Sequence, residues 1–301
     1  MYLIFNKKNI VFLLILSLFA CSKPSNFDDI HKLANQGDAV SQALFGDAYF
    51  NGEGVAKDYK KAFEWYSKAA QQGNADAQNN LGALYGNGEG VAKDHKKAFE
   101  WYSKAAQQGN VTAQNNLGAA YANGEGVAQD YKKAFEWYSK AAQQGNADAQ
   151  KYIGFLYEDG LGITQNYKKA LEWYSKAAQQ GNADAQYKLA VMYTNGRGIS
   201  KDYEKAFEWY NKAAQQGNEY AQSDLGAAYA NGEGVAQDYK KAFQWYNKAA
   251  QQGNVNAQFT LGMMYHLGEG TAQSNESAAV WLKKAADNGH KDAISLFEDA
   301  K

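Results

Sequence analysis

A 36-residue period runs through most of this 301-residue chain. Its seven tryptophans recur at that spacing, at Trp65, Trp101, Trp137, Trp173, Trp209, Trp245 and Trp281. A period of this length is typical of stacked supersecondary units, each too small to bury its apolar face alone. We therefore divide the chain into seven repeats, 39–74, 75–110, 111–146, 147–182, 183–218, 219–254 and 255–290.

Each repeat has the pattern of two helices joined by a glycine loop. In the repeat 111–146, the residues of the first helix that stay nearly constant among the copies share one face: Ala113, Gln114, Leu117, Gly118 and Tyr121. The loop 123–126 holds two glycines that every copy keeps, which predicts positive φ angles. Asp130 is then the predicted N-cap of the second helix. The pattern predicts an all-α fold without strands.

Three packing details follow from the constant residues. A glycine inside a helix costs ~1 kcal/mol relative to alanine, so we expect another backbone close to Gly118 and its counterparts. Glu136 and Lys140 stand four residues apart in the order that favours a helical ion pair. Trp137 and its counterparts are expected at the junctions of consecutive repeats, where packing is tightest.

The two ends of the array have the pattern of half-repeats. Residues 27–38 follow the register of a second helix, and residues 291–301 follow that of a first helix. Polar-faced caps of this kind keep a one-dimensional stack soluble. We therefore predict capping helices at both ends of the seven repeats.

The N-terminal segment has the features of a secretion signal. Two lysines precede the apolar stretch 10–20, which ends at Cys21, the only cysteine in the chain. This pattern predicts a signal peptide over residues 1–20. Residues 18–21 resemble a bacterial lipobox, which implies that Cys21 is lipidated and that 21–26 form a tether. The protein would then be a periplasmic or outer-membrane lipoprotein. The alternative is a free cysteine in a signal that is cut elsewhere.

The charge balance excludes some classes of partner. Lysine and arginine number 31 against 32 acidic residues, which gives a net charge of −1. Nucleic-acid binding needs a clustered basic face and membrane-surface binding needs a polybasic patch, and the balanced charge gives no reason to expect either feature. Beyond residue 25 no apolar run approaches the ~20 residues that a membrane helix needs. We therefore expect membrane attachment only through the lipid, and no nucleic-acid partner.

The repeat resembles that of the Sel1-like repeat proteins, which are related to the tetratricopeptide repeats. The residues that carry the resemblance are Leu117, Gly118 and Tyr121 of the first helix, the loop 123–127, and the second-helix run 134–146. The resemblance covers residues 27–301. It implies a right-handed α-solenoid with a concave inner surface. It also implies an adaptor role in which the protein binds protein or peptide partners, often at membranes and cell envelopes.

An enzymatic alternative comes from the resemblance alone. A cysteine-rich branch of the family is linked to penicillin binding and β-lactamase activity, but its repeats carry disulfides and this chain has a single cysteine. The Ser-x-x-Lys motif of serine penicillin-recognising enzymes is absent. No two of the four histidines stand three or four residues apart, as a helical metal pair would. We expect no catalytic residue, cofactor or metal, and keep a β-lactamase-like or cell-wall-directed hydrolase as the alternative.

Differences among the seven copies point to a candidate binding face. Positions 2, 5, 9 and 12 of the first helix vary and lie opposite the constant stripe, on the face that the resemblance assigns to the concave surface. Bulky apolar residues there are typical of contact sites. The predicted partner-binding residues are Phe155, Tyr187, Phe259 and Met263. The alternative is that these side chains drifted or pack against the adjacent second helix.

Overall fold

The structure is a computed structural model that describes residues 27–298. The predicted signal peptide 1–20 and the predicted lipidation site Cys21 with the tether 21–26 lie outside the described residues, so they stay predictions. The C-terminal cap is described as far as Glu298.

All regular elements within residues 27–298 are α-helices, and α3 to α16 each span 13 residues. In chain order they are α2 (Phe27–Asn35), α3 (Ala39–Asn51), α4 (Tyr59–Gln71), α5 (Ala75–Asn87), α6 (His95–Gln107), α7 (Val111–Asn123), α8 (Tyr131–Gln143), α9 (Ala147–Asp159), α10 (Tyr167–Gln179), α11 (Ala183–Asn195), α12 (Tyr203–Gln215), α13 (Glu219–Asn231), α14 (Tyr239–Gln251), α15 (Val255–Leu267), α16 (Asn275–Asp287) and α17 (Lys291–Glu298). The odd-numbered helices from α3 to α15 are the first helices of the repeats, and the even-numbered helices from α4 to α16 are the second.

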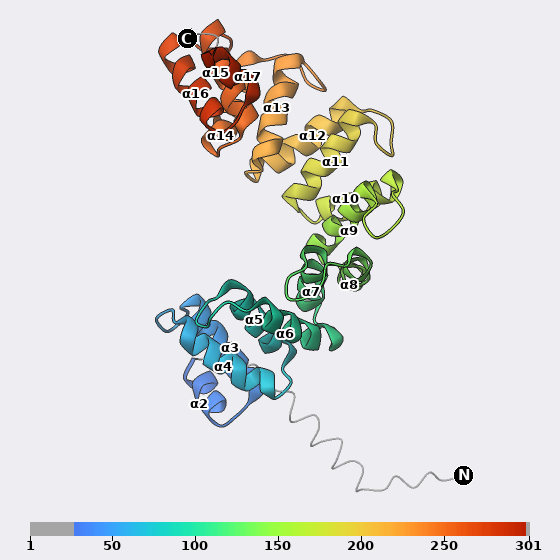
Figure 1. The fold of residues 1–301 in the computed structure, drawn as a ribbon, viewed down its shortest axis with the longest axis vertical. Helices are drawn as coiled ribbons and strands as arrows, with labels where there is room; N and C mark the ends of the chain where they lie inside the picture. The colour runs from blue at the N-terminus through green and yellow to red at the C-terminus, as the bar shows by residue number, and fades with distance from the viewer. Residues whose placement is uncertain (1–26, 299–301) are drawn as a thin grey trace, which may run out of the picture. The chain divides into compact units, whose positions relative to one another are not determined.

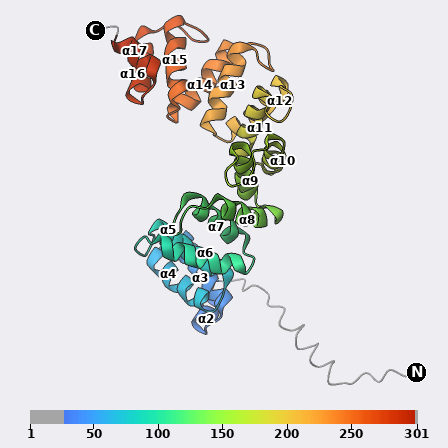
Figure 2. The ribbon, with the colours of Figure 1, turned by 45° about the vertical axis from the view of Figure 1, so that its right-hand side comes forward.

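The helices fall into two compact units, which divide between Gln129 and Asp130. Helices α2 to α7 belong to the first unit and α8 to α17 to the second. Within each unit every helix packs against the next along the chain (Figures 1 and 2). The chain is therefore an α-solenoid of seven helix–turn–helix repeats, as predicted. The capping helices are present as well, because α2 packs on α3 and α17 packs on α16.

Side-chain caps begin both helices of each repeat. All seven predicted caps of the second helices accept a hydrogen bond from the first helical turn, as Asp130 does from the backbone nitrogen of Lys133 at 3.1 Å. The first helices from α5 to α15 begin in the same way at the asparagine that ends the preceding repeat, and α3 begins at Asp38. Asn146, for example, accepts from the backbone nitrogen of Ala149 at 2.8 Å. Each chain reversal therefore satisfies amides that a helix start would otherwise leave unpaired.

A buried glutamine at the fourth position of each repeat joins successive helices. The side-chain nitrogen of Gln78 donates to the carbonyl of Ala70 at 3.1 Å, and its oxygen accepts from Gln108 at 2.7 Å. The same pair of bonds recurs at Gln186, which bonds to Ala178 and Gln216. Burying an amide costs little when both of its ends are bonded. The glutamines therefore link one repeat to the next inside the stack.

The nearest neighbour of the helix glycines is a side chain of the second helix, and the predicted backbone lies slightly farther away. A Cβ on Gly82 would lie 2.8 Å from the ring of Tyr102, and one on Gly154 would lie 2.7 Å from the ring of Tyr174. The Cβ on Gly82 would lie 3.2 Å from the carbonyl oxygen of Ala98. The backbone approach is closer at the second loop glycine. A Cβ on Gly162 would lie 2.6 Å from the carbonyl carbon of Tyr131 in the preceding repeat. Gly162 also has a φ of +71°. Its position therefore requires both a close backbone approach and a left-handed conformation, and glycine is the residue that suits both.

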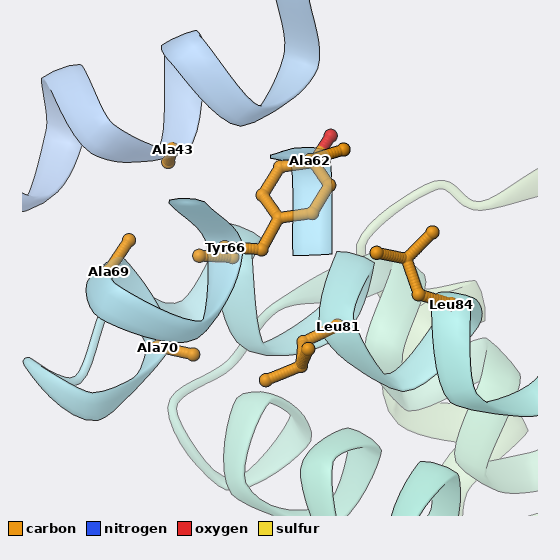
Figure 3. Close-up of a cluster of buried hydrophobic side chains, with 8 residues drawn as sticks. Ala43, Ala62, Tyr66, Ala69, Ala70, Leu81 and Leu84 are labelled. Carbon is orange, nitrogen blue, oxygen red and sulfur yellow. The ribbon is translucent and has the colours of Figure 1, made fainter. Parts of the chain in front are cut away.

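In five of the seven repeats the core consists of alanines around a buried tyrosine, which is Tyr66, Tyr138, Tyr174, Tyr210 or Tyr246. Figure 3 shows Tyr66 of α4 beside Ala62 and Ala69 of the same helix, with Leu81 of α5 and Ala43 of α3 nearby. Alanine lets neighbouring helices approach closely, and the tyrosine ring fills the remaining space. The core is therefore repeated along the chain and not collected in one centre.

The tryptophans lie at the junctions of the repeats, as predicted. Trp101 packs against the core cluster formed by α4 and α5, and Trp281 packs against the cluster of α14 and α15. The lysine three residues after each tryptophan lies over the indole ring, with its Nζ 3.7–4.2 Å from the ring centroid. The predicted Glu136–Lys140 ion pair is absent from the described residues, because the Lys140 ammonium is held over Trp137.

Candidate partner-binding site

Two of the four predicted binding residues, Phe155 of α9 and Tyr187 of α11, line the same cleft. This cleft, here called the apolar cleft, has a volume of about 320 Å³ and lies in the second unit. Both side chains are half-buried and pack on the core. The residues lining the apolar cleft are Lys151, Tyr152, Phe155, Tyr174, Asp184, Tyr187, Lys188, Asn218 and Tyr220.

Aromatic side chains from three first helices form the walls of the apolar cleft. Tyr152 of α9 and Tyr220 of α13 are 37% and 55% exposed. The ring centroid of Tyr187 lies 5.9 Å from that of Tyr220 and 6.0 Å from that of Tyr210. Rings of this size that stay open to solvent offer apolar area without the large entropy loss of flexible side chains.

The charged groups around the apolar cleft are paired with one another. The Glu158 side chain is only 6% exposed, and its carboxylate accepts from the Tyr174 hydroxyl at 2.7 Å and pairs with Lys188 at 3.2 Å and Arg197 at 3.4 Å. Lys151 pairs with Asp184 at 3.1 Å. These ion pairs hold the cleft walls in place and leave its open area mainly aromatic.

A second cavity adjoins the first, because Tyr187 lines both. This cavity, here called the acidic pocket, has a volume of about 310 Å³. Its charged lining residues are Asp224 of α13 and Glu233 of the following loop. The hydroxyls of Tyr187 and Tyr210 face Asp224 as hydrogen-bond donors, and burial of this carboxyl raises its pKa above the ordinary value. The other lining residues are Val191, Thr194, Asn195, Tyr203, Ala206, Phe207, Ala227 and Ala228.

The first unit contains a counterpart of the acidic pocket. This cavity of about 250 Å³ is lined by Tyr102, Asn116 and Glu125, among others. The three residues occupy the repeat positions of Tyr210, Asp224 and Glu233. An amide therefore stands in the first unit where the second unit has a carboxylate.

The structure places the other two predicted residues elsewhere. Phe259 of α15 stacks on the ring of His290, with centroids 4.2 Å apart and an interplanar angle of 10°. Met263 lines a separate cavity of about 380 Å³ near the C-terminal end, together with Leu296. Neither residue lines the apolar cleft. The four predicted residues therefore do not share one cavity, and their role in partner binding stays a prediction.

The sixth position of the first helix also contributes to both cavities, although the sequence-based predictions did not include it. This position supplies Tyr152 and Lys188 to the apolar cleft and Asp224 to the acidic pocket. The signal was present, because the sixth residue changes from asparagine in the second and third repeats to tyrosine, lysine and aspartate in the next three. A comparison of all thirteen helix positions would have found it.

A family model for the Sel1 repeat matches the chain seven times, at 39–74, 75–110, 111–146, 147–182, 183–218, 219–254 and 255–290. The chain belongs to the Sel1 repeat family. Sel1 repeats generally act as scaffolds for protein–protein interaction. No protein of curated function is similar enough in sequence to count as a match.

Solved structures of Sel1 repeat proteins resemble this one closely. A protective antigen of uropathogenic Escherichia coli strains is 40% identical, with a TM-score of 0.77 over 88% of this chain. The Sel1 repeat protein spans 57% of the length of that antigen. A Sel1 repeat protein from Oxalobacter formigenes is 36% identical, with a TM-score of 0.73 over 81% of this chain and 96% of the other.

Neither a membrane span nor a metal site occurs in the described part of the Sel1 repeat protein. Between residues 27 and 298, no helix is both long and apolar enough to cross a bilayer. The same part of the chain contains no group of three or more histidine, cysteine, aspartate or glutamate side chains arranged to hold a metal ion.

Proposed function

We propose that this Sel1 repeat protein is an envelope-anchored scaffold that binds a protein partner at the apolar cleft. The observation that carries the proposal is the cleft itself, a cavity of about 320 Å³ whose open walls are aromatic. A peptide segment of a partner would insert bulky apolar side chains between Phe155 and Tyr187. Aromatic anchors in such clefts provide most of the free energy of many protein interfaces.

The comparison among repeats supports a binding role for the cleft residues. Where Phe155 stands at the ninth position of its repeat, the second and third repeats have Ala83 and Ala119. Those repeats form the same helices with alanine, so the fold does not require a phenylalanine there. A large side chain that folding does not require, and that lines an open cleft, is expected to contribute to binding.

The anchor is the second part of the proposal. Cys21 would carry the lipid and hold the repeats at the membrane surface, since several acyl chains anchor a protein stably. Replacing Cys21 with serine is expected to release the protein from the membrane fraction or to leave an unprocessed precursor. Metabolic labelling with a fatty-acid analogue measures the modification directly. A wild-type protein that incorporates no label would contradict the anchor and leave the cleft proposal intact.

Site-specific photo-crosslinking in cells tests the cleft. A photoreactive phenylalanine analogue at Tyr152 is expected to capture a defined partner. The same analogue at Tyr239 is the control, because this tyrosine of the same unit is similarly exposed, at 39%, and lines none of the cavities described above. Mass spectrometry of the captured band identifies the partner.

A cleft variant makes the capture experiment quantitative. The double substitution of Phe155 and Tyr187 with alanine is expected to weaken capture by at least about tenfold, as the loss of two interface anchors would. Val280→Ala removes apolar area from an exposed side chain of α16 and is expected to have no effect. Equal capture from positions 152 and 239, or capture that is insensitive to the double substitution, would show that the cleft is not the binding site.

A further inference from the structure

We propose that the partner segment presents a lysine or arginine next to its bulky apolar side chain, and that the acidic pocket receives this cation. The inference rests on the proposed function, because it assigns the chemistry of the partner at the same site. The apolar side chain would enter the apolar cleft, and the cation would enter the acidic pocket, since Tyr187 lines both cavities.

The two carboxylates of the acidic pocket lack cationic partners. Among the described residues, neither Asp224 nor Glu233 forms an ion pair within 4.0 Å, and no lysine or arginine lines the pocket. The carboxylates around the apolar cleft differ in this respect, since Glu158 and Asp184 are both paired. A desolvated carboxylate that meets only hydroxyl groups retains most of its cost of burial. A ligand cation would offset that cost.

The rings around the two carboxylates suit a cation as well. Tyr203, which is 40% exposed, lines the pocket together with Tyr187, Phe207 and Tyr210. The faces of aromatic rings attract lysine and arginine head groups, and their bodies contact the apolar stems of those side chains. The chain already uses this contact, because every repeat lysine that follows a tryptophan lies over the indole ring.

The internal repeats indicate that folding does not require the charge at Asp224. The counterpart cavity of the first unit has Asn116 at this position, and its side chain donates to Asn79 at 3.0 Å. The sixth repeat is the only one with a carboxylate at the sixth position. The acidic pocket therefore differs from its counterpart by a group that costs stability and that supplies negative charge beside an apolar cleft.

A peptide-display selection tests the inference and does not require the natural partner. The full chain, purified in detergent, is used to select from a library of random 12-residue peptides. The enriched peptides are expected to pair lysine or arginine with a nearby aromatic or large aliphatic residue. The same selection on Asp224→Asn is expected to keep the apolar residue and to lose the cation. Asp287→Asn, which removes an exposed charge of α16, is the control and is expected to give the wild-type motif.

Matched synthetic peptides measure the size of the effect. Replacing the selected arginine with citrulline keeps the shape of the side chain and removes its charge. This change is expected to weaken binding to the wild type about tenfold, as the loss of a charged hydrogen-bonded pair does. Its effect on Asp224→Asn is expected to be less than about twofold, because the charge partner is already gone. Thermal melts of each variant show whether it is folded.

The outcomes separate this inference from the proposed function. One outcome is that the enriched peptides carry only apolar residues and depend on Phe155 but not on Asp224 for binding. This result would contradict the inference of a cation and leave the proposed scaffold function intact. If the wild type enriches peptides no more strongly than the Phe155→Ala, Tyr187→Ala variant does, both the inference and the proposed function are contradicted. Sedimentation of the chain as a dimer that Asp224→Asn dissociates would show that the occupant is a second copy, which also contradicts the inference.

Discussion

At the scale of single residues, Asp224 shows how a binding group is kept at a cost in stability. Burial raises the pKa of its carboxyl, while the donors Tyr187 and Tyr210 act in the opposite direction. Glu233, Tyr220 and Tyr246 also interact with the ionisable groups of this site, and none of them supplies a positive charge. The ionised carboxylate is therefore less favourable in the folded protein than in the unfolded chain.

We expect Asp224→Asn to be at least as stable as the wild type near neutral pH. A carboxyl whose folded pKa is raised contributes stability that is full below the unfolded value of 3.8 and is lost as the pH rises through the folded pKa. The melting temperature of the variant should therefore rise relative to that of the wild type as the pH increases above about 4. Melts of both proteins across this range measure the difference. If the melting temperature of the variant falls relative to that of the wild type as the pH rises, the raised pKa of Asp224 is contradicted.

Two glycines of α5 provide a matched pair of substitutions. A Cβ on Gly82 would lie 2.8 Å from the Tyr102 ring, whereas one on Gly86 would have its nearest neighbour, Ala98, at 3.7 Å. We expect Gly82→Ala to cost about 1–3 kcal/mol through overpacking. Gly86→Ala should gain about 0.5–1 kcal/mol, because the unfolded chain loses freedom and the helix has room. Chemical denaturation measures both, and similar effects at the two sites would contradict this account of the helix glycine.

At the scale of the helix, each second helix is held by its cap and by its tryptophan. The cap satisfies the first amides, and the tryptophan packs the helix against the preceding repeat. Trp209 contacts two core clusters. One is formed by α10 and α11, and the other by α11, α12 and α13. Trp281 packs against one cluster, that of α14 and α15. The lysines lie over both rings at similar distances, 4.0 and 4.2 Å.

We therefore expect Trp209→Ala to destabilise the second unit more than Trp281→Ala does. Phe or Trp to Ala changes in cores typically cost about 3–5 kcal/mol, and Trp209 should fall in that range. Trp281 should cost less, because within the described residues it packs against a single cluster and because α17, the helix beyond its repeat, is short. Both variants lose the same lysine–indole contact, so this contact cancels in the comparison. Equal losses in urea denaturation would show that the second cluster contributes nothing.

At the scale of the whole chain, stability arises from contacts between neighbours in sequence. Gln78 bonds to Ala70 and Asn74 caps α5 in the same way as Gln114 bonds to Ala106 and Asn110 caps α7. These equivalent contacts make the repeats interchangeable along the stack.

Deleting the repeat 75–110 should therefore leave a folded helical protein. Asn74 would then cap α7, and Gln114 would meet the carbonyl of Ala70 in place of Ala106. Deleting only 75–92 removes α5 and most of the loop after it. This deletion joins the second helices α4 and α6 directly, and these two helices lack matching faces. Circular dichroism and thermal melts should show a cooperative transition for the first deletion and a weakened or absent one for the second. Equal damage from the two deletions would refute the periodic account of stability.

Local signals in the amino-acid sequence were enough to predict the helices, their order and their caps. The 36-residue period, Asp130 and its counterparts, and the loop glycines are signals of this kind, because helix starts and tight turns depend on residues within a few positions of one another. Repetition strengthened these signals, since seven copies show which residues stay constant. The family resemblance rested on the same local residues.

Which variable residues share a cavity became apparent only from the packing of the helices. Phe155 and Tyr187 are 32 positions apart and line one cleft, whereas Phe259, at the same repeat position as Tyr187, is covered by His290. Asp224 meets Tyr187 and Tyr210 through contacts between successive helices, which the spacing along one helix does not reveal. Side chains of this kind are brought together by the packing of one repeat on the next. The pattern within a single repeat therefore predicts the helical face they occupy but not their neighbours.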